Sequence, residues 1–205
     1  MKLPTWLRHC VARIEAGSSG YLDQVGWIRT RAERLSRDIR GEPMPWFTYP
    51  ALHLISERVQ PSWRVLEFGA GMGTLWWSRH VHEVVAIEHD ETWASKISRE
   101  CDVQLILVPA SNANDYLQPA RGSAPYEVVV VDGMFRNECL EVSPELLTGD
   151  GVIVLDDAQR EEYQLAISAL RRQGFNALAL HGPQPVSKHP GCTAILYRDV
   201  NVLGL

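Results

Sequence analysis

Apolar and polar positions alternate in blocks along most of this chain. From residue 64 onward, short runs rich in β-branched residues predict buried strands at 64–68, 83–88, 103–108, 127–132 and 151–156. Patterns with helical spacing predict helices near 73–81, 91–100, 112–118, 136–147 and 159–173. Because strands and helices alternate, we expect a doubly wound α/β fold, with a mostly parallel sheet between two layers of helices.

The two ends of the chain break this alternation. Residues 175–181 and 192–198 are strand-like and have no helix between them, which predicts an antiparallel pair at the end of the sheet. Helical patterns cover 3–16 and 21–40, and a shorter helix follows Thr48 and stops before Pro61. We therefore expect an N-terminal helical extension over 1–45 and one α/β domain over 46–205.

Composition narrows the class of protein. The 205 residues carry a formal net charge of −5, which disfavours nucleic-acid partners because phosphate binding depends on Lys and Arg. The cysteines are widely spaced, which disfavours a disulfide framework or a zinc site. The sequence has no apolar run of membrane-spanning length and no signal-peptide pattern, so we expect a cytoplasmic protein without a membrane partner.

The most informative stretch is "VLEFGAGMG", where glycines follow the first predicted strand at every second position. Gly69, Gly71 and Gly73 leave the backbone bare at the carboxyl end of a strand, where doubly wound sheets bind ligands. A dinucleotide site favours a Gly-x-Gly-x-x-Gly spacing instead. Glu67 would also repel a pyrophosphate and attract an ammonium group. The alternative interpretation of the three glycines is a plain tight turn that binds no ligand.

A second acid points to the other end of the same ligand. Glu88 ends the second predicted strand and can accept hydrogen bonds from both hydroxyls of a ribose. Sites for NAD share this feature, so Glu88 alone does not discriminate between the cofactors. An amino-acid end together with a ribose indicates S-adenosylmethionine.

With "VVAIEHD", the acid-ended fourth strand and the terminal antiparallel pair, this loop resembles the class I S-adenosylmethionine-dependent methyltransferases. The resemblance covers about residues 46–198. It implies a Rossmann-like, seven-stranded sheet whose last strand is antiparallel. The residues expected to contact the cofactor are Glu67, Gly69, Ala70, Gly71, Gly73, Thr74, Glu88, His89, Ser111, Asn112 and Asp132. The adenine contact after the third strand is often an aspartate in this family, and "PASNAND" has none where Ser111 and Asn112 stand.

Carboxylates end the fourth and fifth predicted strands and are the candidate catalytic residues. Asp132, Asp156 and Asp157 have a spacing similar to that of catechol-type O-methyltransferases, which hold magnesium. Those enzymes carry an Asp-Asn pair after the fifth strand, whereas this chain has Asp-Asp. Three interpretations stay open: a Mg²⁺ site, a general base or substrate contact, and caps of the following helices.

A closer resemblance concerns the acceptor of the methyl group. "PWFTYPAL", "DGMFRNEC" and "DDAQREEY" resemble segments of bacterial methyltransferase-like proteins, some of which lie among polysaccharide or natural-product genes. This implies a small-molecule or glycan hydroxyl as acceptor. The candidate substrate contacts are Trp46, Tyr49, Arg136, Arg160 and His181. The competing interpretations are core packing for the aromatics, pairing with local acids for the arginines, and solvation for the histidine.

The leading hypothesis is therefore an S-adenosylmethionine-dependent O-methyltransferase. An RNA or protein methyltransferase, a dinucleotide-dependent oxidoreductase and a non-catalytic cofactor-binding protein are the alternatives. Base methylation in this family usually shows an Asn/Asp-Pro-Pro-aromatic run after the fourth strand, where this chain has "DGMF". The N-terminal 45 residues either cover the active site or form the contact of a homodimer.

Overall fold

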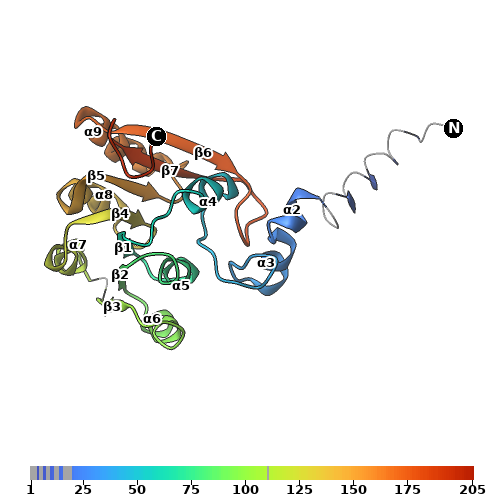
Figure 1. Cartoon of the computed structure of the whole chain (residues 1–205), viewed down its shortest axis with the longest axis horizontal. Coiled ribbons are helices and arrows are strands. Elements are labelled where there is room, and N and C mark those ends of the chain that lie inside the picture. Colours follow the sequence, from blue (N-terminus) through green and yellow to red (C-terminus); the bar gives the residue numbers. More distant parts are fainter. Residues whose placement is uncertain (1–3, 5–6, 8–9, 12–13, 16–19, 110) are drawn as a thin grey trace.

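The computed structural model describes residues 4, 7, 10–11, 14–15, 20–109 and 111–205 (Figure 1). The helix predicted at 3–16 lies largely outside the described residues. Among the described residues, no helix is both long and apolar enough to cross a membrane.

One seven-stranded sheet forms the centre of the molecule and confirms the predicted fold. Its strands are β1 (Arg64–Phe68), β2 (Glu83–Glu88), β3 (Gln104–Leu107), β4 (Tyr126–Val131), β5 (Leu147–Leu155), β6 (Asn176–Gly182) and β7 (Gly191–Tyr197). The spatial order is β3-β2-β1-β4-β5-β7-β6. Strands β1 to β5 pair in parallel, and β7 pairs antiparallel with both β5 and β6. Because the order reverses between β1 and β4, a crevice is expected at their carboxyl ends.

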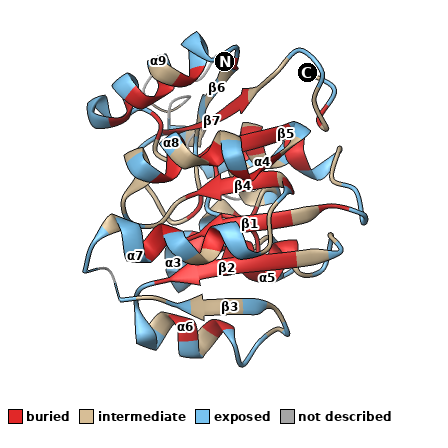
Figure 2. Cartoon of the chain, turned by 90° about the vertical axis from the view of Figure 1, so that its left-hand side faces the viewer, coloured by how far each residue is buried: buried red, intermediate tan, exposed pale blue. Residues whose placement is uncertain are grey.

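Helices cover both faces of this sheet, as the alternation of strands and helices predicts. They are α4 (Tyr49–Ser56), α5 (Met72–Trp77), α6 (Glu91–Ile97), α7 (Ala113–Leu117), α8 (Arg136–Leu146) and α9 (Gln164–Arg172), with short 3₁₀ turns at Gln118–Gly122 and Glu161–Tyr163. Neighbouring strand residues face opposite layers. Leu66 and Phe68 join the core under α7, α8 and α9, whereas Val65 joins the core under α4 and α5. The central strands β1, β2, β4 and β5 are largely buried (Figure 2).

The N-terminal part differs from the single helix predicted at 21–40. It forms α2 (Tyr21–Gln24) and α3 (Trp27–Glu33), separated by Gly26 with a φ of 81°. A Cβ at Gly26 would lie 2.7 Å from the backbone of Asp38, so the chain folds back tightly there. Residues 34–40 are not helical, and Arg37 instead forms an antiparallel bridge with Pro43.

Hydrogen bonds join this N-terminal part to the β6–β7 loop. The backbone N–H of Val186 donates to the Thr30 hydroxyl at 2.9 Å, and the Trp27 indole donates to the Ser187 carbonyl at 2.9 Å. The Thr48 N–H donates to the Thr193 hydroxyl of β7 at 2.9 Å. Segments far apart in the sequence thus meet at one edge of the sheet, where the carboxyl ends of the parallel strands lie.

Two glycines pack back to back where β1 and β4 end. Gly69 has a φ of 94°, and a Cβ there would lie 2.8 Å from the Gly133 Cα. A Cβ at Gly133 would lie 2.8 Å from the Gly69 nitrogen, 2.9 Å from the Phe68 carbonyl carbon and against the Tyr116 hydroxyl. Bare backbone on both sides therefore lets the two strand ends approach each other.

We expect Gly133→Ala to destabilise the protein by about 1–3 kcal/mol, because the added methyl group overpacks this contact. Urea unfolding measures the change. Gly149→Ala is the matched control, since nothing lies within 4 Å of its Cβ position, and it should stay within about 0.5 kcal/mol of wild type. Equal effects of the two substitutions would contradict this packing.

Candidate functional site

A cavity of about 1060 Å³ opens at the carboxyl ends of β1, β2, β4 and β5. Its floor consists of the glycine loop after β1 and the acid-containing ends of the other three strands. Its walls come from residues 34–36 and 45–47 and from Gln184 and Ser187 of the β6–β7 loop. The cavity therefore lies where the reversal of strand order places a ligand site in such sheets.

Glu67 is a buried carboxylate that lines this cavity from β1, with 4% of its surface exposed. The Thr74 hydroxyl donates a hydrogen bond to it. A Cβ at Gly73 would lie 2.6 Å from Glu67 Oε1, so the glycine leaves room for the carboxylate beside α5. Burial raises the pKa of Glu67 to about 8, and a cationic ligand would bring that pKa back down.

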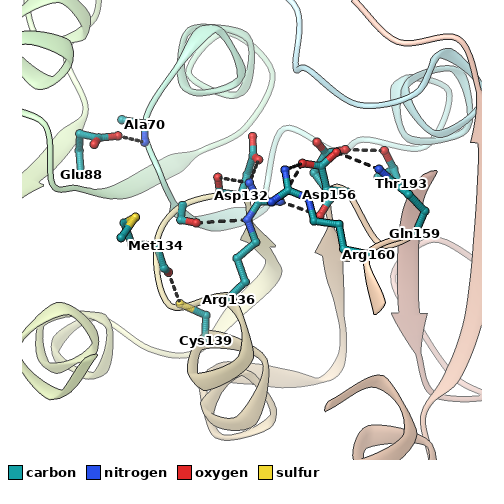
Figure 3. Close-up of polar contacts among 12 residues, drawn as sticks. Ala70, Glu88, Asp132, Met134, Arg136, Cys139, Asp156, Gln159, Arg160 and Thr193 are labelled. Atoms are coloured by element: carbon teal, nitrogen blue, oxygen red, sulfur yellow. Dashed lines mark hydrogen bonds and ion pairs between the residues drawn. The ribbon is translucent and has the colours of Figure 1, made fainter. Parts of the chain in front are cut away.

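Glu88 fixes the glycine loop to the end of β2. Its carboxylate accepts backbone N–H groups from Ala70 at 2.8 Å, His89 at 2.7 Å and Asp90 at 2.8 Å (Figure 3 shows the contact with Ala70). Glu88 is 3% exposed and also lines the cavity. Oε1 of Glu88 accepts the His89 and Asp90 N–H groups and lies 2.8 Å from the His89 Nδ1, whereas Oε2 accepts only the Ala70 N–H and retains an acceptor position for a ligand hydroxyl.

Trp93 on α6 is a cavity residue that the sequence patterns do not reveal. Its indole N–H donates to the Ala70 carbonyl, so it holds the glycine loop from the opposite side to Glu88. Gly71 is extended, with a φ of −171°, and its Cβ position meets only Trp93, at 3.6 Å. The only sequence signal was the position of Trp93 in the first turn of the helix that follows Glu88.

Arg136 ties the ends of β4 and β5 together. Its guanidinium donates to the carbonyls of Gly133 at 3.1 Å, Asp132 at 2.9 Å and Asp156 at 2.7 Å, and to the Asp132 carboxylate at 2.9 Å (Figure 3). Its side chain is 13% exposed and lies over the Tyr163 ring. Arg136 is thus occupied by the protein itself and acts as a positioning residue.

The strand-end acids differ in their surroundings. Burial raises the pKa of Asp132 to about 6, while Arg136 lowers it. Burial and the neighbouring acids raise the pKa of Asp156 well above its usual range, although the Thr193 hydroxyl donates to it at 2.8 Å. Asp157 accepts a hydrogen bond from Arg160. Arg136 also lies 3.8 Å from the Asp157 carboxylate, so Asp132 and Asp157 are paired with guanidinium groups, whereas Asp156 is paired with a hydroxyl.

This arrangement does not fit the expected Mg²⁺ site. Among the described residues, no group of three or more His, Cys, Asp or Glu side chains is arranged to hold a metal ion. Mg²⁺ needs near-octahedral oxygen ligands, whereas two of the three acids are already paired with guanidinium groups. We therefore derive no catalytic step through a metal.

Thirteen of the candidate residues line the cavity, and most of them lie at or just after the carboxyl ends of strands. They are Glu67, Gly69, Ala70, Gly71, Gly73, Glu88, His89, Asp132, Asp156, Asp157, Trp46, Arg136 and Arg160. Thr74 lies behind the loop, where it donates to Glu67 and accepts the Gly71 N–H. Trp46 is 43% exposed and belongs to the cavity wall that residues 34–36 and 45–47 form.

Four candidates lie away from the cavity, each for a local reason. Tyr49 is 3% exposed and packs into the core beneath α4. His181 is an exposed residue of the edge strand β6, opposite Cys192. Asn112 caps α7 by accepting the Asp115 N–H at 2.9 Å. Ser111 is exposed beside it, and residue 110 lies outside the described residues.

Solved structures with a similar fold include methyltransferases. A precorrin-6y C5,15-methyltransferase from Geobacter metallireducens aligns with a TM-score of 0.55 and 18% identity, over 73% of this chain and 87% of its own. A putative O-methyltransferase from Klebsiella pneumoniae aligns with 0.55 and 15%, over 93% and 95%. An rRNA methylase from Streptococcus thermophilus aligns with 0.51 and 15%, over 73% and 96%.

The chain has the fold of the class I S-adenosylmethionine-dependent methyltransferases. No protein-family model matches the sequence, and a comparison with curated proteins finds no significant match. The structural neighbours share fewer than one residue in five with this chain, so they establish its fold and leave its acceptor open.

We expect Arg136→Met to destabilise the protein by about 3–5 kcal/mol, because three carbonyls and buried carboxylates lose their donor. Arg160→Met is the control, since the Arg160 side chain is 50% exposed, and it should cost less than about 1 kcal/mol. Urea unfolding at pH 7 measures both. Similar losses for the two variants would show that Arg136 does not tie the strand ends.

We also expect Glu67→Gln to stabilise the ligand-free protein increasingly as the pH rises. The folded-state pKa is about 8, so between about pH 4.5 and 8 the folded chain keeps a proton that the unfolded chain has lost. Wild type therefore loses stability as the pH rises through this window, and the amide removes that loss. Thermal melts at pH 5, 6.5 and 8 measure it, and a constant difference between the two proteins would contradict the raised pKa.

Proposed function

We propose that this protein is an S-adenosylmethionine-dependent methyltransferase that methylates a hydroxyl oxygen of a small molecule or glycan. The observation that carries the proposal is the charge of the cavity. Glu67, Glu88 and Asp156 line it as buried acids, and Asp132 lines it as a partly buried one, in a fold that methyltransferases share. S-adenosylmethionine brings two positive charges, an ammonium and a sulfonium, into that environment.

The glycine loop supports the orientation of the cofactor. Glu67 would hold the ammonium, since its carboxylate lines the cavity beside Gly73. Glu88 would accept hydrogen bonding from the ribose through Oε2, because it lines the same cavity and Oε2 accepts only the Ala70 N–H. The pyrophosphate of a dinucleotide would instead meet the Glu67 carboxylate, which disfavours an oxidoreductase.

The bound cofactor supplies a methyl group already activated on its sulfonium, so the protein must position the acceptor and remove its proton. We assign the role of proton acceptor to Asp132. A pKa of about 6 leaves it ionised at neutral pH, and its side chain is 33% exposed in the cavity. Burial and the neighbouring acids raise the pKa of Asp156 well above its usual range, and Asp156 would hold the acceptor hydroxyl by hydrogen bonding.

The acceptor contacts the wall that residues 45–47 and the β6–β7 loop form. Trp46 offers an exposed aromatic face in this wall, and Met134, which follows β4, adds an apolar side chain that is 39% exposed in the cavity. Aromatic faces of this kind pack against flat or ring-shaped molecules. The net charge of −5 disfavours an RNA backbone, which needs cationic contacts.

Transfer of a radioactive methyl group tests this function. Purified protein and methyl-labelled S-adenosylmethionine are incubated separately with a metabolite and glycan extract, with total RNA and with total protein. We expect the wild-type protein to label the metabolite and glycan extract, with or without added Mg²⁺. Asp132→Asn protein should not label it. Label in RNA or protein alone would support an alternative acceptor, and no label in any pool would contradict the proposed activity.

We expect Glu88→Ala to weaken S-adenosylhomocysteine binding by about 1–3 kcal/mol, because ribose hydroxyls and loop N–H groups lose their acceptor. Calorimetric titration measures the change. Glu100→Ala, an exposed acid at the end of α6, is the control and should bind as wild type does. Glu88→Gln keeps the side-chain size if the alanine variant folds poorly. Unchanged affinity in both Glu88 variants would remove the ribose assignment.

A further inference from the structure

Three arginines line the cavity, and they differ in what occupies their guanidinium groups. Arg136 donates to the strand ends, and Arg160 pairs with Asp157 and Glu162. Arg34 is exposed, and its side chain forms no hydrogen bond or ion pair with any residue that the structure describes. It is therefore the arginine of the cavity that remains available to an anion.

The backbone at Arg34 is unusual. Arg34 ends α3 in the left-handed region, with a φ of 54°, and its N–H donates to the Thr30 carbonyl at 2.9 Å. Residues other than glycine adopt this conformation infrequently, and it often marks a functional position. Here it ends the helix and takes the chain directly into the cavity wall, where Leu35 and Ser36 follow.

The neighbours of Arg34 place it at the glycine-loop end of the cavity. Leu35 packs against the cluster that includes Ala70 of that loop and Met72 and Leu75 of α5. Glu67 lines the same cavity from β1, the strand that leads into this loop.

Pro45 provides a second link to the same end. The Ser36 hydroxyl donates to the Pro45 carbonyl at 3.2 Å. A Cβ at Gly73 would lie 3.7 Å from the Pro45 Cα and 2.6 Å from Glu67 Oε1. Residues 34–36 and Pro45 thus form one wall beside Glu67.

We propose that Arg34 binds the carboxylate of the methionine end of the cofactor, while Glu67 binds its ammonium. This inference rests on the proposed function. An amino-acid end carries opposite charges on one carbon atom, so its site needs an acid and a base at the same end of the cavity. A guanidinium pairs with a carboxylate through two parallel hydrogen bonds, which a lysine cannot reproduce.

The charge of the site explains why this contact matters. Glu88 and Asp132 would repel an incoming carboxylate, as would Glu67 once it ionises beside the ammonium. Arg34 offsets that repulsion at the end where the carboxylate must lie. Hydrogen bonds also join α3 to the β6–β7 loop. The contact between Arg34 and the carboxylate therefore connects the cofactor to the wall that faces the acceptor.

Two ligands distinguish a contact between Arg34 and the amino-acid end from a general effect of Arg34 on cofactor binding. S-adenosylhomocysteine has the amino-acid end, whereas 5′-methylthioadenosine keeps the adenosine and the thioether but lacks that end. We expect Arg34→Ala to weaken S-adenosylhomocysteine binding by about 10- to 100-fold, the range for losing a hydrogen bond to a charged group, with Arg34→Lys restoring only part of it. Binding of 5′-methylthioadenosine should not change.

Arg40→Ala is the matched control, since Arg40 is an exposed arginine of the same segment outside the cavity lining. It should bind both ligands as wild type does. If wild type binds S-adenosylhomocysteine and Arg34→Ala binds it equally well, the Arg34 assignment is overturned and the proposed function stands. Equal weakening of both ligands in Arg34→Ala also overturns it. Wild type that binds neither ligand overturns the proposed function itself.

Discussion

The burial of acidic side chains around a single cavity is the constraint on which the rest of this structure depends. Isolated carboxylates are costly to bury, and each one here is compensated in a different way. Glu88 accepts three backbone N–H groups, Asp132 is paired with Arg136, and Asp156 accepts the Thr193 hydroxyl. These same contacts fix the glycine loop, join β4 to β5 and attach β7, so charge compensation and site geometry arise from one set of bonds.

Glu67 is the member of this group whose compensation depends on a ligand. Thr74 donates one hydrogen bond to it, yet burial still raises its pKa to about 8. An ionised carboxylate there destabilises the empty protein and attracts a cation, which is the usual conflict between stability and binding at functional sites. An ammonium group beside Glu67 resolves the conflict. The acid-lined cavity and the methyltransferase fold therefore support the same cofactor for independent reasons.

The sequence predicted the sheet well because its signals are local. Runs such as "VVVVD" favour buried strands because they are short and β-branched, and glycines before a helix indicate a loop that a ligand approaches. The sequence-based predictions were wrong where contacts between residues far apart in the sequence determine the local structure. Gly26 breaks the helix predicted at 21–40 because α3 turns to meet the β6–β7 loop, and Tyr49 faces the core because α4 packs on the sheet. Spacing alone suggested magnesium, but it could not show that Arg136 and Arg160 already occupy two of the three acids.

The most direct test of this account is calorimetric titration of the wild-type protein with S-adenosylhomocysteine at pH 7, repeated in two buffers that differ in ionisation enthalpy. If Glu67 is protonated in the empty cavity and ionises when the ammonium arrives, binding releases a proton and the measured heat differs between the buffers. The account predicts micromolar or tighter binding with this buffer dependence, and loss of the dependence in Glu67→Gln. Absence of binding, or equal heats in both buffers, would contradict it.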